Sequence, residues 1–439
     1  MTRKQLLIIV AGAVAILLVI FLCPIFFPSI CARKGSQCKP VSLQIWGVYD
    51  EASVFTDLIK AYEKQNKCVK IYYEMKNTHD YEETLKDAFV LGKGPDIFLI
   101  HNTWLPKYKG IIKEVPSTFL QFNVFRDTFV DVVENDLSGD NKIYGLPLYV
   151  DTLALYYNVD YFNSAGISSP PETWYDLIDD LDKLTKKNQW GAIEQAGIAM
   201  GTAENINRST DILALLMLQN GTKMVSQDKK SVGFNQTVLM EDGSYYPGQD
   251  ALRFYTEFAN PSQRNYTWNK QMPYSIDAFV DGKTVMMINY SHHIVTIKSR
   301  APYLNFRIGL MPQIKDRKFD INYANYWAFA VSNKTTSTVS EEAWKFIIYL
   351  TNKENAKQYL QKTKRPTSRR DLVDWQKDDL ELGVFAKQSL SARNWYQIDN
   401  NKIETILAEA IDSVVLGRAN VRKALDTASS QINLLMKKE

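Results

Sequence analysis

The sequence predicts an α/β protein of two lobes that follows an N-terminal membrane-spanning helix. Strand-like and helix-like segments alternate between Ser42 and Ile100, and this order implies a parallel sheet covered by helices. About 400 residues follow the apolar N-terminus, which is too many for one hydrophobic core and suits two lobes. The apolar run at the N-terminus itself predicts the membrane span.

Residues 1–35 have the pattern of a signal anchor. Arg3 and Lys4 precede the almost wholly apolar run Leu6–Leu22, and the next charged residue comes only after Ala32. A basic start keeps the N-terminus cytoplasmic, and about 20 apolar residues cross a bilayer. No A-x-A-like cleavage site follows, so we expect an uncleaved anchor and a body on the extracytoplasmic face of the cell membrane. A cleaved signal peptide stays an alternative.

The cysteines add two open questions and exclude one kind of site. Lipid modification of Cys23 or Cys31 is disfavoured, because neither follows a small residue. In an oxidising compartment Cys38 could pair with Cys68, but the sequence does not decide this. There is no CxxC pair and no Cys/His cluster with the spacing of metal ligands, so we expect no metal site and no cofactor.

Composition excludes nucleic acid as a partner. The chain has 52 basic and 49 acidic residues with a net charge of +3, whereas a nucleic-acid-binding protein needs a basic face. Aromatic residues make up 12% of the chain. A surplus of Tyr and Trp beyond the needs of a core suits a site for sugar or peptide.

The first lobe begins with a repeated strand–helix pattern. Loops at the carboxyl ends of parallel strands meet at one edge of a sheet, where ligands bind. Here these loops are Gly47–Glu51 and His101–Trp104, and both carry polar and aromatic residues. The predicted elements are strands at 42–46, 69–73 and 96–100 and helices at 54–62 and 81–91.

The rest of the chain predicts further helices and strands without an internal repeat. Thr173 follows Pro170-Pro171 and can cap the next helix. The expected helices are 211–219, 249–258, 341–350 and an amphipathic tail at 400–438, and the expected strands are 284–288, 306–312 and 326–331.

The segment Tyr144–Asn158 holds two apolar runs on either side of one acidic residue. Val150, Leu153 and Leu155 indicate a strand buried on both faces. Asp151 interrupts this strand, and a buried carboxylate is costly unless a polar group meets it. Either Asp151 is a capping or turn residue, or it contacts a ligand.

Several segments, in order, resemble the extracellular solute-binding proteins of ABC importers, specifically the carbohydrate-binding group that includes maltodextrin-binding proteins. Each segment alone is a weak signal, but together they span nearly all of the chain after residue 40. The segments are LQIWGVYD at 43–50, GKGPDIFLI at 92–100, YGLPLYVDTLALYYN at 144–158, FVDGKTVMMINYS at 279–291, YWAFAVS at 326–332 with AWKFIIYLT at 343–351, and RPTSRRDL at 365–372.

The resemblance implies a periplasmic-binding-protein-like fold of type II, in which two α/β lobes are joined by a multi-crossing hinge and close on a solute. Residues 40–148 with 313–351 would form lobe 1, and residues 149–312 with 352–439 would form lobe 2. The first crossing would precede Asp151, and later crossings would lie near 309–313 and near Thr351. Such a protein is expected to act as a monomer and not as an enzyme.

The resemblance also implies which residues hold the solute. A sugar needs planar donors and acceptors for its hydroxyls and aromatic rings for its C–H faces. The residues placed in the cleft are Tyr49 and Asp50, Asn102, Thr103 and Trp104, Asp151, Tyr290 and His292, Asn325, Tyr326 and Trp327, and Trp395.

Some of these residues have a structural interpretation as well. Asp50 could cap the helix that follows it, and Asn102 could satisfy its own loop backbone. Tyr326 and Trp327 alternate in a strand, so at most one of them can face the cleft.

The predicted function is that of a membrane-tethered binding protein that delivers a sugar or oligosaccharide to the permease subunits of an ABC importer. An anchored carbohydrate-active enzyme is the alternative from another class, and Asp50 with Asp151 is the only candidate pair of catalytic acids. A third alternative keeps the binding fold but changes the solute to a polyamine, a metal ion or a peptide.

Overall fold

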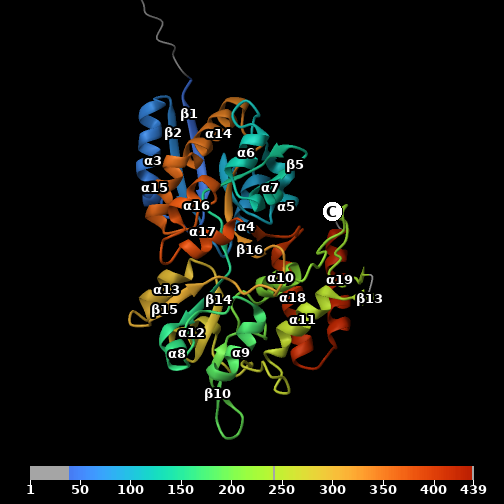
Figure 1. Ribbon diagram of the computed structural model, residues 1–439. Coiled ribbons are helices and arrows are strands. Elements are labelled where there is room, and N and C mark those ends of the chain that lie inside the picture. The colour runs from blue at the N-terminus through green and yellow to red at the C-terminus, as the bar shows by residue number, and fades with distance from the viewer. Residues whose placement is uncertain (1–38, 241–242, 438–439) are drawn as a thin grey trace, which may run out of the picture.

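The computed structural model describes residues 39–240 and 243–437 as two lobes, each built on its own β-sheet (Figure 1). The predicted membrane anchor, residues 1–35, lies outside the described residues. Among the described helices, none is both long enough and apolar enough to cross a bilayer. Cys68 is disulfide-bonded, and its partner also lies outside the described part of the chain.

The first lobe contains a six-stranded sheet with the strand order β2-β1-β3-β17-β4, and β7 pairs with β17 beside it. As predicted, the first three strands are parallel, and β17 runs antiparallel to β3. The strands are β1 (Val41–Gly47), β2 (Val69–Met75), β3 (Ile97–His101), β4 (Ile112–Lys113), β7 (Leu146–Pro147) and β17 (Trp327–Ser332), with a small β5 (Ser138–Gly139) and β6 (Lys142–Ile143) hairpin.

The helices of the first lobe come from both halves of the chain. Apolar faces such as Phe55, Leu58 and Tyr62 of α3 are buried against the sheet, which is the amphipathic pattern expected of a surface helix. The helices are α3 (Ala52–Gln65), α4 (Tyr81–Val90), α5 (Leu105–Tyr108), the short η1 (Lys109–Ile111), α6 (Phe122–Thr128), α7 (Asp131–Leu137), α14 (Ser337–Thr351), α15 (Lys353–Thr363) and α16 (Arg370–Gln376).

The second lobe contains a five-stranded sheet with the order β10-β11-β14-β9-β15. The central strand β14 is buried at every position, which explains its continuous apolar sequence. The strands are β9 (Ala154–Asn158), β10 (Lys186–Lys187), β11 (Ile193–Ile198), β14 (Thr284–Asn289) and β15 (Phe306–Gly309), and β12 (Val238–Met240) with β13 (Gly243–Tyr245) forms a separate hairpin.

The helices of the second lobe include the C-terminal tail, which was predicted as one helical stretch at 400–438. Thr173 caps α9 through a capping box with Asp176, as the sequence predicted for this position. The tail forms two helices, because Gly417 takes a left-handed conformation (φ 66°) between them. The helices are α8 (Val159–Ser164), α9 (Trp174–Leu184), α10 (Ser209–Gln219), α11 (Pro247–Glu257), α12 (Ser275–Val280), α13 (His293–Arg300), α17 (Gly383–Ser389), α18 (Asn400–Val415) and α19 (Val421–Met436).

The segment Tyr144–Asn158 contains the strand that Val150, Leu153 and Leu155 predicted, but this strand is divided after Thr152. It contributes β7 to the first sheet, β8 (Asp151–Thr152) to a small sheet between the lobes, and β9 to the second sheet. The small sheet has the order β18-β16-β8, with β16 (Asn322–Asn325) in the middle and β18 (Ala392–Arg393) at one edge. We call it the crossing sheet, because the chain passes between the lobes there.

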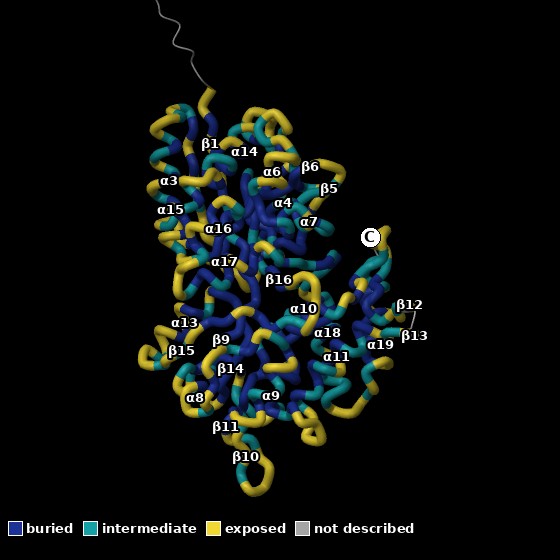
Figure 2. Tube along the Cα trace, in the orientation of Figure 1, coloured by how far each residue is buried: buried dark blue, intermediate teal, exposed yellow. Residues whose placement is uncertain are grey.

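The two hydrophobic cores show where the chain crosses. Buried positions fill the interior of each lobe, while the outer loops are exposed (Figure 2). Val150 belongs to the core of the first lobe and Leu153 to that of the second. At the second crossing, Tyr323 belongs to the core of the second lobe and Ala324 to that of the first. The first predicted crossing therefore falls close to its expected place, whereas the second lies about ten residues after the predicted 309–313.

The predicted boundary at Thr351 differs from the division of the cores. Ala356, Tyr359, Leu360 and Leu372 all pack in the core of the first lobe, although residues 352–439 were assigned to the second. An ion pair contributes to this: Arg365 donates to Asp50 Oδ1 at 2.8 Å, and the Tyr359 hydroxyl donates to Asp50 Oδ2 at 2.7 Å. The chain reaches the second core between Leu372 and Leu382, and Ala392 of the crossing sheet packs once more in the first core.

The hinge-side carboxylate of Asp151 is bound by protein groups. It accepts hydrogen bonds from the Ser291 backbone N–H at 3.0 Å, the Ser291 hydroxyl at 2.7 Å and the Thr152 N–H at 2.9 Å. The side chain of Asp151 is thereby satisfied within the protein, which offsets the cost of burying its charge. Asp151 joins the crossing sheet to the loop that follows β14.

Replacing Asp50 with Ala should destabilise the first lobe strongly, because it leaves the half-buried Arg365 without its carboxylate. We expect a loss of about 3–5 kcal/mol in the free energy of unfolding, measured by denaturant titration. Arg253→Ala breaks the exposed Arg253–Asp250 pair and serves as the control, with a loss under about 1 kcal/mol. Equal losses in the two variants would contradict the structural role of Asp50.

Replacing Asp151 with Ala should also destabilise the protein, since three donors lose a charged acceptor. The expected loss is about 2–3 kcal/mol in the free energy of unfolding. The exposed Asp374 gives a matched control, for which Asp374→Ala should change stability by less than about 0.5 kcal/mol. An Asp151→Ala protein as stable as wild type would show that these bonds contribute nothing.

Candidate ligand-binding site

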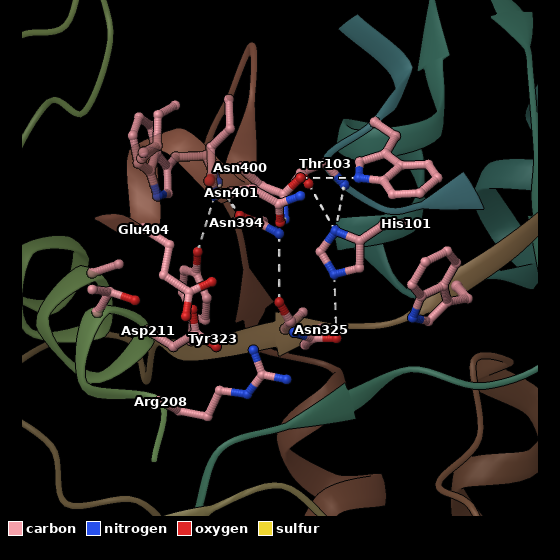
Figure 3. Close-up of a pocket in the computed structure, with 18 of the residues that line it drawn as sticks. His101, Thr103, Arg208, Asp211, Tyr323, Asn325, Asn394, Asn400, Asn401 and Glu404 are labelled. Atoms are coloured by element: carbon pink, nitrogen blue, oxygen red, sulfur yellow. Dashed lines mark hydrogen bonds between the residues drawn. The ribbon is translucent and has the colours of Figure 1, made fainter. Parts of the chain in front are cut away.

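A cavity of about 220 Å³ lies between the lobes and is lined by residues of both (Figure 3). The crossing strand β16 contributes Tyr323, Ala324 and Asn325. The first lobe contributes Tyr49, Thr78, His79, Tyr81, Glu82, His101, Thr103, Trp104 and Trp327, and the second contributes Arg208, Thr210, Asp211, Ala214, Asn394, Trp395, Gln397, Asn400, Asn401, Ile403, Glu404 and Leu407.

The first lobe gives the cavity an aromatic wall. Trp327 lies at its centre and makes edge-to-face contacts with Tyr49, Tyr81 and Trp104, with ring centroids 5.9, 5.9 and 5.1 Å apart. The rings of Tyr81 and Trp104 are stacked at 6.1 Å. Such contacts hold the rings rigid, so they can present flat apolar faces with little loss of side-chain entropy. Tyr49 has a left-handed backbone (φ 66°) and is 55% exposed.

A partly buried histidine orients polar groups beside this wall. His101 Nδ1 lies 2.7 Å from Thr103 Oγ1, and His101 Nε2 lies 3.3 Å from Asn325 Oδ1. Burial lowers the pKa of His101 to about 4, so the ring is neutral at pH 7. A neutral ring has one N–H, and the Asn325 oxygen can only accept, so Nε2 carries the proton and Nδ1 accepts from Thr103. The amide nitrogen of Asn325 is left for other partners.

The opposite wall, from the second lobe, carries charged groups. Arg208, Asp211 and Glu404 face His101, Thr103 and Asn325 across the cavity (Figure 3). Burial raises the pKa of Asp211, and Arg208 opposes this rise. Burial and the neighbouring Asp211 both raise the pKa of Glu404. These planar polar groups can each form paired hydrogen bonds with a ligand.

Residues behind this wall hold it in place. The Tyr290 hydroxyl donates to Asp211 Oδ2 at 2.8 Å, and the Arg208 guanidinium lies 5.7 Å from the centre of the Tyr290 ring. Arg208 itself has a left-handed backbone (φ 63°) just before α10, a conformation that is uncommon for residues other than glycine. Such backbone strain is often found at binding sites.

Of the residues predicted to hold a solute, the structure brings one group together in the cavity lining: Tyr49, Thr103, Trp104, Asn325, Trp327 and Trp395. Trp395 is buried, and its Nε1–H has no hydrogen-bond partner in the described part of the chain. Strand alternation correctly predicted that only one of Tyr326 and Trp327 faces the cavity.

The other predicted residues lie outside the cavity lining. Asp50 and Asp151 bind within the protein as described above, and Tyr290 supports Asp211 from behind. The Asn102 amide and the Tyr326 hydroxyl both donate to Asp136 Oδ2, at 2.8 and 3.0 Å.

His292 is exposed and lies outside the cavity lining. Its side chain is 52% exposed and stacks on Tyr290 outside the cavity lining, with Nδ1 3.7 Å from Asp151 Oδ2. The position after β14 therefore supports the site from behind.

Sequence reasoning missed the charged wall and part of the first lobe's lining. Arg208 and Asp211 begin a helix that was predicted only for its apolar core, and Glu404 lies in the first turns of a helix predicted only as amphipathic. One part of the sequence could have indicated further polar residues of the lining: Asn394, Gln397 and Asn400 lie close in sequence to Trp395, which was predicted. No local pattern indicates the left-handed Arg208.

His101 should make stability depend on pH. Its pKa is near 4 when folded and 6.5 when unfolded, so only the unfolded chain takes up a proton on this side chain between these values. Stability must therefore fall as the pH drops from 6.5 to 4. In His101→Gln this fall should be smaller, as measured by urea titrations at a series of pH values. Identical slopes in the two proteins would contradict the assignment.

Comparison with known proteins places the chain among binding proteins. The sn-glycerol-3-phosphate-binding periplasmic protein UgpB of Escherichia coli is 26% identical over 409 residues, covering 87% of this chain and 89% of that protein. The galactooligosaccharide-binding protein of Bacillus subtilis is 21% identical over 411 residues, covering 92% and 91%.

Solved structures share the fold. The sugar-binding protein MalE of Xanthomonas citri superposes with a TM-score of 0.76 at 18% identity, covering 90% of this chain and 98% of that one. UgpB of Mycobacterium tuberculosis, in complex with glycerophosphocholine, superposes with a TM-score of 0.70 at 15% identity, covering 91% and 99%. Residues 57–382 match the family described as bacterial extracellular solute-binding protein, and the chain belongs to this family.

Proposed function

We propose that this protein is the extracytoplasmic substrate-binding component of an ABC importer, which captures a sugar or oligosaccharide between its lobes and delivers it to the permease. The N-terminal segment would hold the body at the outer face of the membrane, and one copy would suffice to bind the solute. No cofactor takes part, because capture and release need only closure and opening of the lobes.

The observation that carries this proposal is the division of the cavity into an aromatic wall and a polar wall. The rings of Trp327, Trp104 and Tyr49 offer faces on which the C–H groups of a sugar ring can lie. Arg208, Asp211, Glu404 and Asn325 offer donors and acceptors for hydroxyl groups. Since the walls belong to different lobes, a ligand that touches both favours the closed arrangement.

The charge of the lining favours a sugar over a phosphate ester. Among the charged residues that line the cavity, Glu82, Asp211 and Glu404 are acidic, and Arg208 is the one Lys or Arg. A phosphate would place its negative charge beside these carboxylates, which is unfavourable in a partly buried site. The galactooligosaccharide-binding relative therefore supports the proposal more than the glycerol-phosphate-binding ones do.

The acidic pair considered for an enzyme does not support that alternative. Asp50 and Asp151 lie outside the cavity lining, and both carboxylates are engaged by protein donors. A glycosidase needs two carboxyl groups that flank the bond to be cleaved. A binding role requires no such pair.

Binding should be detected as a rise in melting temperature with a panel of mono- and oligosaccharides, followed by mass spectrometry of the recovered ligand. Intact sugar would support the proposal. Conversion of the sugar to a product would favour an enzyme, and a response only to glycerol phosphate, polyamine or metal would change the class of solute.

Replacing Trp327 with Ala should weaken sugar binding by about 10- to 100-fold, because about 1.4–2.7 kcal/mol of contact with the sugar face is lost. Titration calorimetry would measure this, with melting temperature as the check on folding. Trp190→Ala is the matched control, since Trp190 is 81% exposed and does not line the cavity. Similar affinities for Trp327→Ala and wild type would argue against the aromatic wall as the sugar platform.

A further inference from the structure

A second set of contacts joins the lobes at the side of the cavity opposite the crossing sheet. Trp104 Nε1 donates to Asn400 Oδ1 at 2.9 Å, and Asn401 Nδ2 donates to Glu82 Oε2 at 3.2 Å. Lys107 Nζ lies 2.6 Å from Glu82 Oε1 and 3.3 Å from Asp399 Oδ2. We call these contacts the rim contact, formed by Glu82, Trp104 and Lys107 of the first lobe and 399–401 of the second.

The charged groups of the rim contact are well paired. The side chains of Lys107, Glu82 and Asp399 are only 15–17% exposed, so water screens their attraction less than on an open surface. Burial alone would raise the pKa of Glu82, but the hydrogen bonds from Lys107 and Tyr108 hold it below its usual range. Asp399 is also the N-cap of α18 and accepts from the Lys402 N–H at 3.3 Å, which keeps its carboxylate in place.

The rim contact bounds the cavity. Glu82, Trp104, Asn400 and Asn401 take part in the rim contact and also line the cavity. In Figure 3, Asn400 and Asn401 lie at one side of the cavity, and Asn325 of β16 lies at the other. The cavity volume of about 220 Å³ is below the roughly 300–1,000 Å³ of sites that hold drug-sized ligands.

We propose that the rim contact sets the upper limit on ligand length, so that the protein selects a sugar of about one or two rings over longer chains. This inference rests on the proposed sugar-binding function. A longer chain would need the space taken by 399–401 against Glu82 and Trp104, so it would bind only with the rim contact broken. Part of the closed-state stabilisation would then be lost.

The first test compares ligands on the wild-type protein. Affinities are measured by calorimetry for α-1,4-linked glucose and β-1,4-linked galactose series of one to five units. We expect the tightest binding at one or two units and at least a tenfold loss by three or more. Undiminished binding of the longer sugars would overturn the length limit while leaving the sugar-binding function intact. If no sugar of any series binds, the proposed function fails, and the length limit fails with it.

The second test removes the ion pairs of the rim contact without changing a residue of the cavity lining. Lys107→Met and Asp399→Asn are chosen because neither residue lines the cavity, and Asn still caps α18. In each variant the affinity for the short sugar should fall about three- to tenfold, while that for longer sugars holds or rises. The ratio of the affinity for short sugars to that for longer sugars should therefore decrease. The double variant should lose no more than either single one, because both residues act through one contact.

Lys345→Met provides the control. It breaks the Lys345–Glu342 pair, 3.2 Å apart, which lies within the first lobe alone, and its length preference should match wild type. Melting temperatures without ligand show whether each variant is folded. A length preference unchanged in a folded Lys107→Met or Asp399→Asn protein would overturn the inference, as would an equal loss of affinity for all lengths.

Discussion

The cavity depends on the small crossing sheet, where backbone hydrogen bonds hold three distant parts of the chain at one point. β16 pairs with β8 on one side and with β18 on the other, so residues near 151, 324 and 392 are kept adjacent. Asn325, on the central strand, carries a side chain into the cavity and accepts from His101 of the first lobe. The positions of both walls are set by this sheet, because each lobe continues from its strands.

The fold could be predicted from the sequence where its signals are local. Periodicity and capping identified the first parallel strands, Thr173 at the start of α9, and the alternation of Tyr326 and Trp327. The division of the strand predicted from Val150, Leu153 and Leu155 was missed, because a chain that is buried in two successive sheets is as apolar as one buried strand. Arg365 and Asp50 are in contact although they are 315 residues apart in the sequence, and no local pattern can reveal such a contact.

The site could be predicted only in part, for a related reason. Tyr49 and Trp104 lie in loops that the strand–helix pattern placed at the carboxyl ends of strands, whereas Trp327 was expected from the family resemblance. The two carboxylates that the sequence singled out, Asp50 and Asp151, do not line the cavity, because they accept hydrogen bonds from Arg365 and Ser291 within the protein. The acids that do line the cavity, Asp211 and Glu404, lie in early turns of two helices and look like ordinary surface residues. These two side chains line one cavity only because the two helices pack together in the folded chain.

The direction of β1 has a mechanical consequence. Its carboxyl end leads directly to Tyr49 at the cavity, so its amino end at Val41 points away from the second lobe (Figure 1). Its 7 residues, at about 3.3 Å each, span roughly 20 Å. A force applied to the chain ahead of β1 would therefore act on the first lobe, at the end remote from the crossing sheet, and would reach the second lobe only through the crossings.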